Sequence, residues 1–128
     1  MRGLVDTSIF IAQEAGRDVG ALPDEGAISV ITVAELHVGV LRAKDAKTRA
    51  RRLLTLARAE RDFEAIAIDS TVARVYATIA AQARSEGRRP QAVDVWIAAT
   101  AVRHELILYT HDVDFRTIPQ VKVFRSAF

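Results

Sequence analysis

The segment PQAVDVWIAATAVRHELILYTHD, residues 90–112, contains in one run the two kinds of element that decide the fold. Residues 90–104 are nearly all apolar and are expected to form a helix that is buried on most sides. Residues 106–109 form a short apolar run, which is typical of a strand buried on both faces of a parallel sheet. One acid, Asp94, lies inside the helix, and another, Asp112, follows the strand. The segment therefore predicts a helix–strand unit of an α/β protein with carboxylates placed near it.

Outward from this segment, short apolar strands and helices alternate along the chain. The alternation predicts an α/β fold of three layers, in which helices cover both faces of a mainly parallel sheet of about five strands. No repeat or linker interrupts the pattern, so residues 1–128 are expected to form a single domain. The expected strands are 2–5, 27–30, 65–68, 106–109 and 121–124, and the expected helices are 7–15, 32–41, 45–61, 70–87 and 90–104.

The composition excludes several classes of protein. Of the 128 residues, 50% are hydrophobic, which is enough for a folded core without covalent staples. The chain contains no cysteine, which excludes a disulfide scaffold, a thiolate zinc site and a cysteine nucleophile. No apolar run reaches about 18 residues, so no membrane span is expected, and Asp6 comes too early for a secretory leader. We therefore expect a cytoplasmic globular domain.

Acidic residues follow the ends of several expected strands. Asp6 follows the first strand, Asp112 and Asp114 follow the fourth, and Asp94 lies in the apolar helix. Glu35 lies one turn into the helix that follows the second strand. Because parallel sheets bind ligands beyond the carboxyl ends of their strands, we expect these carboxylates to face one cleft.

Each acid also has a purely structural interpretation. Asp6 suits the N-cap of the first helix, and Thr32-Val33-Ala34-Glu35 is typical of a capping box in which the glutamate reaches back to the cap amide. Asp94 falls in the first turn of its helix, where the helix dipole favours negative charge. Asp112 and Asp114 would also suit the cap of a short helical turn.

Carboxylates crowded into one cleft repel one another unless a cation lies among them. Hard divalent ions prefer oxygen ligands, so Mg²⁺ or Mn²⁺ is the expected cofactor. Zinc is not expected, because cysteine is absent and His37, His104 and His111 show no paired ligand spacing.

A second feature is a basic stripe between Arg42 and Arg61, where eight lysine and arginine residues stand against two acids. The helix over residues 45–61 carries most of this stripe, with Leu53, Leu54 and Leu56 as its expected apolar side. Such a stripe favours a polyanionic partner. A solvated, arginine-rich helix face carries the same pattern, so both interpretations stand at this point.

Four motifs occur in order along the chain: Val5-Asp6-Thr7-Ser8, Thr32-Val33-Ala34-Glu35-Leu36, Asp94-Val95-Trp96-Ile97-Ala98-Ala99-Thr100-Ala101 and Thr110-His111-Asp112-Val113-Asp114-Phe115. Together they resemble the signature of the PIN-domain ribonucleases, and most of all the small VapC-type toxins of bacterial toxin–antitoxin pairs. The resemblance covers the whole chain at ordinary spacing. The segment that begins at Asp94 is its most specific part.

The resemblance implies a Rossmann-like, PIN-like fold and a metal-dependent endoribonuclease. It also implies a homodimer and a VapB-type antitoxin that blocks the acidic cleft. By motif position the acidic quartet would be Asp6, Glu35, Asp94 and Asp112. Of these, Asp6, Asp94 and Asp112 would hold the metal, and Asp112 is favoured over Asp114 as the late ligand. The polar helpers near the metal would be Thr7, Ser8 and Thr110, with Asp114 as a further candidate.

Such a site suits the hydrolysis of RNA phosphodiester bonds. A metal-bound water would be the nucleophile, and a second ion would stabilise the attacking and leaving oxygens. Glu35 would either complete a second, weaker metal site or orient the attacking water. No 2′-hydroxyl attack is needed, so the products should carry 5′-phosphate and 3′-hydroxyl ends. The residues expected to contact the RNA backbone are Arg42, Arg49, Arg51, Arg52, Arg88 and Arg89.

Two other functions fit parts of the pattern. One is a PIN-like module that binds RNA or protein without cleavage. The other is a Mg²⁺-binding phosphoreceiver domain, in which Asp69 would accept the phosphoryl group beside Thr110 and Lys122. The receiver is disfavoured because only one acid, Asp6, follows the first strand and because Asp94 has no role there.

Overall fold

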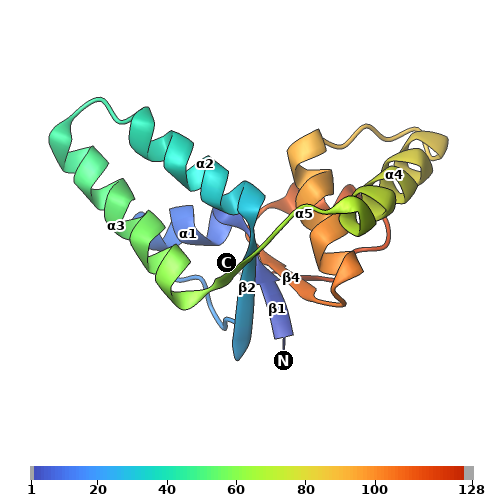
Figure 1. The fold of residues 1–128 in the computed structure, drawn as a ribbon, viewed down its shortest axis with the longest axis horizontal. Coiled ribbons are helices and arrows are strands. Elements are labelled where there is room, and N and C mark those ends of the chain that lie inside the picture. The colour runs from blue at the N-terminus through green and yellow to red at the C-terminus, as the bar shows by residue number, and fades with distance from the viewer. Residues whose placement is uncertain (1, 126–128) are drawn as a thin grey trace.

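A five-stranded, wholly parallel sheet forms the centre of the molecule in the computed structural model, which describes residues 2–125 (Figure 1). The strand order is β3-β2-β1-β4-β5. This confirms the expected α/β fold. The elements are β1 (Arg2–Val5), α1 (Thr7–Glu14), β2 (Glu25–Ser29), α2 (Val30–Leu41), α3 (Ala46–Asp62), β3 (Glu64–Ile66), α4 (Ser70–Ser85), α5 (Ala92–Arg103), β4 (Ile107–Thr110), the 3-10 helix η1 (Val113–Thr117) and β5 (Val123–Arg125).

Helices cover both faces of the sheet, so the molecule has three layers. In Figure 1, α2 and α3 lie on one side of the sheet and α4 and α5 on the other. The side chains of β1 serve both layers, because successive residues of a strand point to opposite faces. Leu4 belongs to the core that α4 and α5 cover, and Val5 to the core under α1, α2 and α3.

Side-chain caps explain where four of the helices begin. Asp6, Ser29, Asp45 and Asp69 are the N-caps of α1, α2, α3 and α4, and each accepts a hydrogen bond from a backbone N–H of the first turn. These bonds satisfy amides that have no partner inside the helix. The structural interpretation of Asp6 as an N-cap is thus confirmed.

The capping box expected at residues 32–35 is wrong. Helix α2 begins at Val30 because the Ser29 hydroxyl accepts the N–H of Ile31 at 3.0 Å. Glu35 is therefore the sixth residue of α2 and lies too far along the helix to reach the cap amide. For the same reason the second strand ends at Ser29 and not at Val30.

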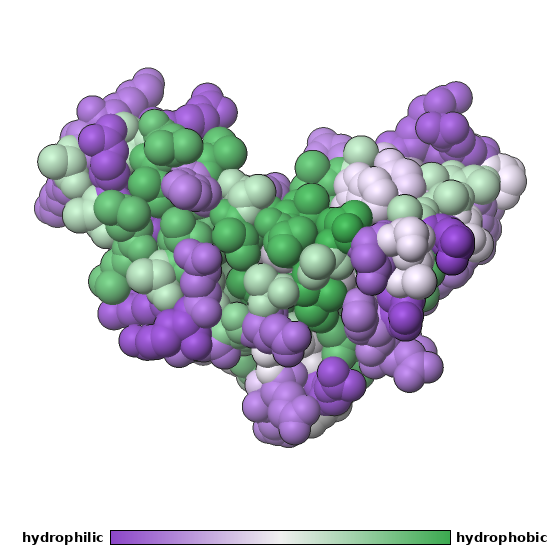
Figure 2. Space-filling view, viewed as in Figure 1, coloured by the Kyte–Doolittle hydropathy of each residue, from purple (hydrophilic) through white to green (hydrophobic). Residues whose placement is uncertain are grey.

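Helices α2 and α3 form a hairpin that carries exposed apolar side chains. Leu56 is buried as expected, but Leu53 and Leu54 are 48% and 50% exposed, which corrects the expectation that all three pack inward. Leu41, at the end of α2, is 72% exposed. Figure 2 shows hydrophobic surface over this hairpin and in the valley between α2 and α5. Among the described residues no helix is both long and apolar enough to cross a membrane.

Candidate active site

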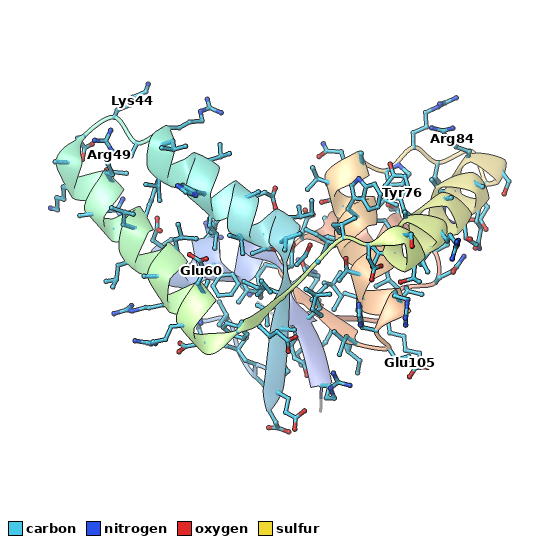
Figure 3. All side chains as sticks on the ribbon, in the orientation of Figure 1. Lys44, Arg49, Glu60, Tyr76, Arg84 and Glu105 are labelled. Atoms are coloured by element: carbon cyan, nitrogen blue, oxygen red, sulfur yellow. The ribbon has the colours of Figure 1, made fainter. Side chains whose placement is uncertain are left out.

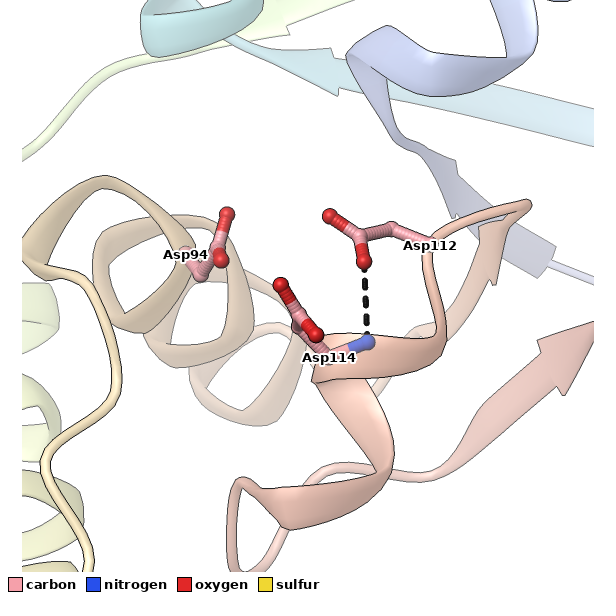
Figure 4. Close-up of side chains that lie close together, drawn as sticks. All are labelled: Asp94, Asp112 and Asp114. Carbon is pink, nitrogen blue, oxygen red and sulfur yellow. Dashed lines mark hydrogen bonds between the residues drawn. The ribbon is translucent and has the colours of Figure 1, made fainter.

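Three carboxylates meet beyond the carboxyl end of β4. Asp94 lies in the first turn of α5, and Asp112 and Asp114 lie at the start of η1. Each offers an oxygen atom, and these atoms all lie within 4.8 Å of one another. In Figure 4 the three side chains converge on one space between α5 and η1. The fold thus brings these acids together at one edge of the sheet, where strand ends place them.

Asp112 has both a structural and a site role. Its Oδ1 accepts the N–H of Asp114 at 2.8 Å, which caps η1 and confirms the cap interpretation (Figure 4). A carboxylate has two oxygens and room for more than one partner. The cap bond therefore leaves Asp112 able to act with Asp94.

Asp6 is not a member of this trio but is linked to it through Thr110. The Asp6 side chain is 4% exposed, and its Oδ2 accepts hydrogen bonds from Ser8 Oγ at 2.7 Å and Thr110 Oγ1 at 2.8 Å. Thr110 Oγ1 in turn accepts the N–H of Asp112 at 2.9 Å. The expected helpers Ser8 and Thr110 thus orient Asp6 and join it to Asp112.

Glu35 reaches the site from α2, with its position set by Thr7. The Thr7 hydroxyl donates to Glu35 Oε1 at 2.6 Å, and Thr7 Oγ1 also lies 2.9 Å from Thr32 Oγ1. Thr32 is fully buried. Thr32 was not predicted as a site residue. Its position three residues before Glu35, on the same face of the helix, is the sequence feature that could have indicated its contact with the site.

Burial and neighbouring negative charge raise the pKa values of three acids of the site, Asp94, Asp6 and Glu35. Burial and then the negative charges of Asp112, Asp6, Asp114 and Glu35 raise the pKa of Asp94 to about 6. Burial raises the pKa of Asp6 against the opposing hydrogen bonds from Ser8 and Thr110. Burial, with the charge of Asp6, raises the pKa of Glu35 against the hydrogen bond from Thr7. All five acids therefore share one electrostatic site.

The donor set fits a hard divalent cation. Asp94, Asp112 and Asp114 present oxygens only, and among residues 2–125 no lysine, arginine or histidine forms an ion pair with any of them. Oxygen ligands of this kind suit Mg²⁺ or Mn²⁺. Such an ion would relieve the repulsion that raises the pKa of Asp94.

Asp69, the alternative phosphoacceptor, lies outside this cluster. It caps α4, where the backbone N–H of Val72 and the Thr71 hydroxyl lower its pKa. It follows β3, an edge strand that β2 and β1 separate from β4. The structure thus gives Asp69 the role of a helix cap.

Four of the six arginines expected to bind RNA lie in two groups beside the acids. Arg88 and Arg89 line a cavity of about 300 Å³ together with Asp94 and Asp114. Arg42 and Arg52 line a groove of about 460 Å³ that includes Glu35. Both groups therefore border the acidic site from different elements of the fold.

Several of these arginines also hold the fold together. Arg49 donates to Ala43 O at 3.1 Å and Arg52 donates to Gly39 O at 2.7 Å, which ties α3 to α2 and the loop between them. The Nε atom of Arg51 lies 3.7 Å from Oε2 of Glu14 in α1, which is an ion pair. Arg88 donates to Thr117 O and to Glu86, which fastens the loop between α4 and α5 to η1. The arginines expected to contact RNA and those that make structural contacts thus overlap.

Comparison with known proteins gives consistent matches. The PIN domain family pattern matches residues 3–121. Ribonuclease VapC5 of Mycobacterium tuberculosis is 42% identical over 91% of this chain and 87% of its own length. Ribonuclease VapC4 of the same organism is 41% identical over 95% of each chain.

Solved structures give the same result. The VapBC-5 toxin–antitoxin structure from Mycobacterium tuberculosis superposes with a TM-score of 0.88 at 39% identity, covering 98% of each chain. The FitAcB structure from Neisseria gonorrhoeae superposes with a TM-score of 0.80 at 30% identity, covering 98% of this chain and 97% of that one.

Proposed function

Since the chain belongs to the PIN-domain family and is closely related to the VapC ribonucleases, we propose that it is a toxin endoribonuclease that hydrolyses RNA at a carboxylate-held divalent metal site. The observation that carries the proposal is the convergence of Asp94, Asp112 and Asp114 within 4.8 Å, with Asp6 and Glu35 coupled to them. A non-catalytic binding module has no need of such a costly group of acids.

Within this proposal, Asp94, Asp112 and Asp6 hold the metal, with Asp114 able to share the site because it belongs to the same close trio as Asp112. When bound, Mg²⁺ or Mn²⁺ supplies a water of lowered pKa and balances charge on the phosphate. The hydrogen bonds that Thr110 and Ser8 donate to Asp6 favour its ionised form against the opposing effect of burial. Glu35, aligned by Thr7, accepts a proton from the attacking water.

The reaction breaks the bond between phosphorus and the 3′-oxygen. The water oxygen bonds to phosphorus, its proton passes to a carboxylate, and the departing 3′-oxygen takes up a proton to become a hydroxyl. The phosphate stays on the 5′-oxygen. Ligation of an adaptor that requires a 5′-phosphate to the cleaved RNA tests this outcome, and products bearing 2′,3′-cyclic phosphates would contradict it.

Affinity for RNA comes from the arginines on both sides of the site. Arg88 and Arg89 stand beside Asp94, and Arg42 and Arg52 stand beside Glu35. Arg49 and Arg51 extend this surface along α3. Such contacts bind phosphates without reading bases, so they position the strand across the acids.

The proposed partner of the toxin is a VapB-type antitoxin. Solved relatives of this chain include a member of the VapBC family of toxin–antitoxin systems from Mycobacterium tuberculosis and a toxin–antitoxin complex from Klebsiella pneumoniae. The groove beside Glu35 contains exposed Ile11 and Val38, at 58% and 50% exposure, next to Arg42. An antitoxin segment with apolar and acidic side chains would fit this groove and cover the site. The proposal places toxin, antitoxin and RNA together in the cytoplasm.

A homodimer is also part of the proposal. The hydrophobic surface in the valley between α2 and α5 suits a second copy of the chain (Figure 2). Light scattering of the purified protein gives the oligomeric state, and a monomer at all concentrations would contradict this part alone.

A further inference from the structure

The acidic site lies next to a second, smaller cavity between α4 and α5. The cavity beside Asp94 and Asp114 shares Arg89 and Pro90 with a cavity of about 150 Å³. This smaller cavity is formed by Tyr76, Ala80 and Arg84 of α4 and by the first turn of α5. A strand that passes the acids beside Arg89 therefore meets this cavity next.

Two arginines at the cavity are available for an anion. Arg84 and Arg89 are both exposed, and among the described residues neither guanidinium has a hydrogen-bond or ion-pair partner. Arg88, by contrast, is held by Thr117 O and Glu86. Guanidinium groups pair with phosphate oxygens through two parallel hydrogen bonds. The cavity thus has two phosphate-binding groups at its edge.

The wall of the cavity contains an aromatic ring that is held in place. Tyr76 stacks on Trp96 of α5 with ring centroids 4.0 Å apart and an interplanar angle of 28°. Tyr76 is half-buried, and Figure 3 shows it between α4 and α5, with Arg84 nearer the end of α4. Tyr76, Ala80 and Arg84 are spaced four residues apart and share one face of α4. The small Ala80 side chain leaves room between the ring and the guanidinium.

We propose that this cavity, which we call the α4–α5 subsite, binds one unpaired nucleotide next to the scissile phosphate. The base contacts Tyr76, and Arg89 and Arg84 hold the phosphates on either side of it. The inference rests on the proposed ribonuclease function and adds a base-binding position to it. A base enters such a cavity only when it is not paired, so the substrate class is single-stranded RNA or a loop.

The size and rigidity of the subsite favour a single base. A volume of about 150 Å³ is well below that of a pocket for a drug-sized ligand. Stacking between a base and an aromatic side chain tolerates any base and contributes affinity. The subsite thus adds affinity and a preference for unpaired structure at one position.

The test measures RNA binding in the Asp94→Asn background, in which RNA is expected to stay intact. The probe is a fluorescent pool of ten-nucleotide single-stranded RNAs of random sequence. Tyr76→Leu keeps an apolar contact with Trp96 but removes the ring, and Tyr76→Phe keeps the ring. Arg84→Gln and Arg89→Gln remove one charge each. Arg74→Gln is the matched control, because Arg74 is exposed on the same helix and does not line the cavity.

We expect Tyr76→Leu to weaken binding about ten-fold, as loss of one stacked base does, and Tyr76→Phe to bind like the parent. Each glutamine variant should weaken binding and lower the slope of log K against log salt by about 0.7, the value for one phosphate of a single strand. A second RNA carries an abasic nucleotide at the position that occupies the subsite. Because it has no base to contact Tyr76, it should bind the parent and Tyr76→Leu equally. Arg74→Gln should bind within about two-fold of the parent, since a remote charge is screened.

Failure of the subsite and failure of the proposed function give different results. If the unsubstituted protein cleaves RNA but the Tyr76, Arg84 and Arg89 variants bind like Arg74→Gln, the subsite is wrong and the ribonuclease stands. If the unsubstituted protein neither binds the pool nor cleaves RNA, the proposed function is wrong and the subsite with it. Thermal unfolding of each variant is measured as a control. A melting temperature like that of the parent shows that the variant is folded and that any loss of binding has another cause.

Discussion

The Thr7 hydroxyl donates a 2.6 Å hydrogen bond to Glu35 Oε1 and so joins the first turn of α1 to the middle of α2. The two residues are 28 positions apart in the chain. As a whole residue Glu35 is exposed at one side of the site, but its carboxylate is partly buried. This burial, together with the charge of Asp6, raises the pKa of Glu35. The bond therefore fixes the direction of a long, charged side chain that would otherwise be free to turn toward solvent.

Thr7→Val should lower RNA cleavage by about ten-fold, a loss of the order expected when one hydrogen bond to a charged group is removed. Thr7→Ser keeps the hydroxyl and should retain most of the activity. Initial rates at saturating RNA measure the effect. Equal activity of the valine and serine variants would show that Glu35 does not need this alignment.

Asp94→Asn should stabilise the metal-free protein at pH 7. The folded pKa of Asp94, about 6, lies above the ordinary value of 3.8, so the folded state binds the proton more tightly than the unfolded chain. The ionised carboxylate thus destabilises the fold above pH 6, by about 1–2 kcal/mol after allowance for solvent screening. Urea unfolding in EDTA measures this gain.

The pH dependence of stability follows from the same shift. Because Asp94, Asp6 and Glu35 all have raised pKa values, the free energy of unfolding of the metal-free protein should fall as the pH rises from about 4 through 6 to 7. The fall should be smaller in Asp94→Asn and unchanged in Asp18→Asn, because the exposed Asp18 carboxylate accepts only the N–H of Gly20 among residues 2–125. A fall of equal size in both variants would contradict the shared acidic site.

Asp112→Asn and Asp114→Asn should separate the two candidate late ligands. Asp112→Asn removes a proposed ligand and should weaken Mn²⁺ binding by about ten-fold or more, whereas Asp114→Asn removes a neighbouring charge of the trio and should weaken binding less. Asparagine at position 112 keeps an oxygen for the N–H of Asp114, so neither variant should lose the cap of η1. Calorimetric titration with Mn²⁺ gives the two affinities, and a normal affinity in Asp112→Asn would make Asp114 the ligand.

Arg52→Ala and Arg42→Ala should differ in stability although both face the groove beside Glu35. Arg52 donates to Gly39 O at 2.7 Å, so its loss should cost about 1 kcal/mol of folding free energy. Arg42 is exposed at the C-cap of α2, and its substitution should weaken RNA binding alone. Thermal unfolding and RNA binding, measured on both variants, separate the two roles.

The sequence predicted the central strands, and the acids that follow them in the chain, because short apolar runs are a strong signal for buried strands. β1 and β4 lie inside the sheet and are largely apolar, and Asp6, Asp112 and Asp114 follow closely. Asp94 was informative because an acid in an apolar helix needs a compensating partner. The distances between the carboxylates could not be predicted from the sequence. Asp6 lies apart from the trio of Asp94, Asp112 and Asp114 because its side chain is held by hydrogen bonds from Ser8 and Thr110.

The start of α2, the buried face of α3 and the packing of α4 against α5 could not be predicted, because the sequence fits more than one arrangement at each. Ser29 and Thr32 both suit an N-cap, and only the structure shows that Ser29 caps α2. Leu53 and Leu54 fit an apolar helix face, but α3 packs through Leu56 and Ala59 and leaves them exposed. The stack of Tyr76 on Trp96 joins two helices whose register no local pattern reveals.

Cleavage of total cellular RNA by the purified, antitoxin-free protein, in Mg²⁺, Mn²⁺ or EDTA and beside Asp94→Asn, tests the metal-dependent ribonuclease. We expect discrete cuts with either metal, none in EDTA, and a loss of at least about 100-fold in the folded variant, since the carboxylate acts only with the ion. Asp18→Asn should cut like the unsubstituted protein. Cuts of equal rate in EDTA, or full activity in Asp94→Asn, would contradict a carboxylate-held metal as the source of the activity.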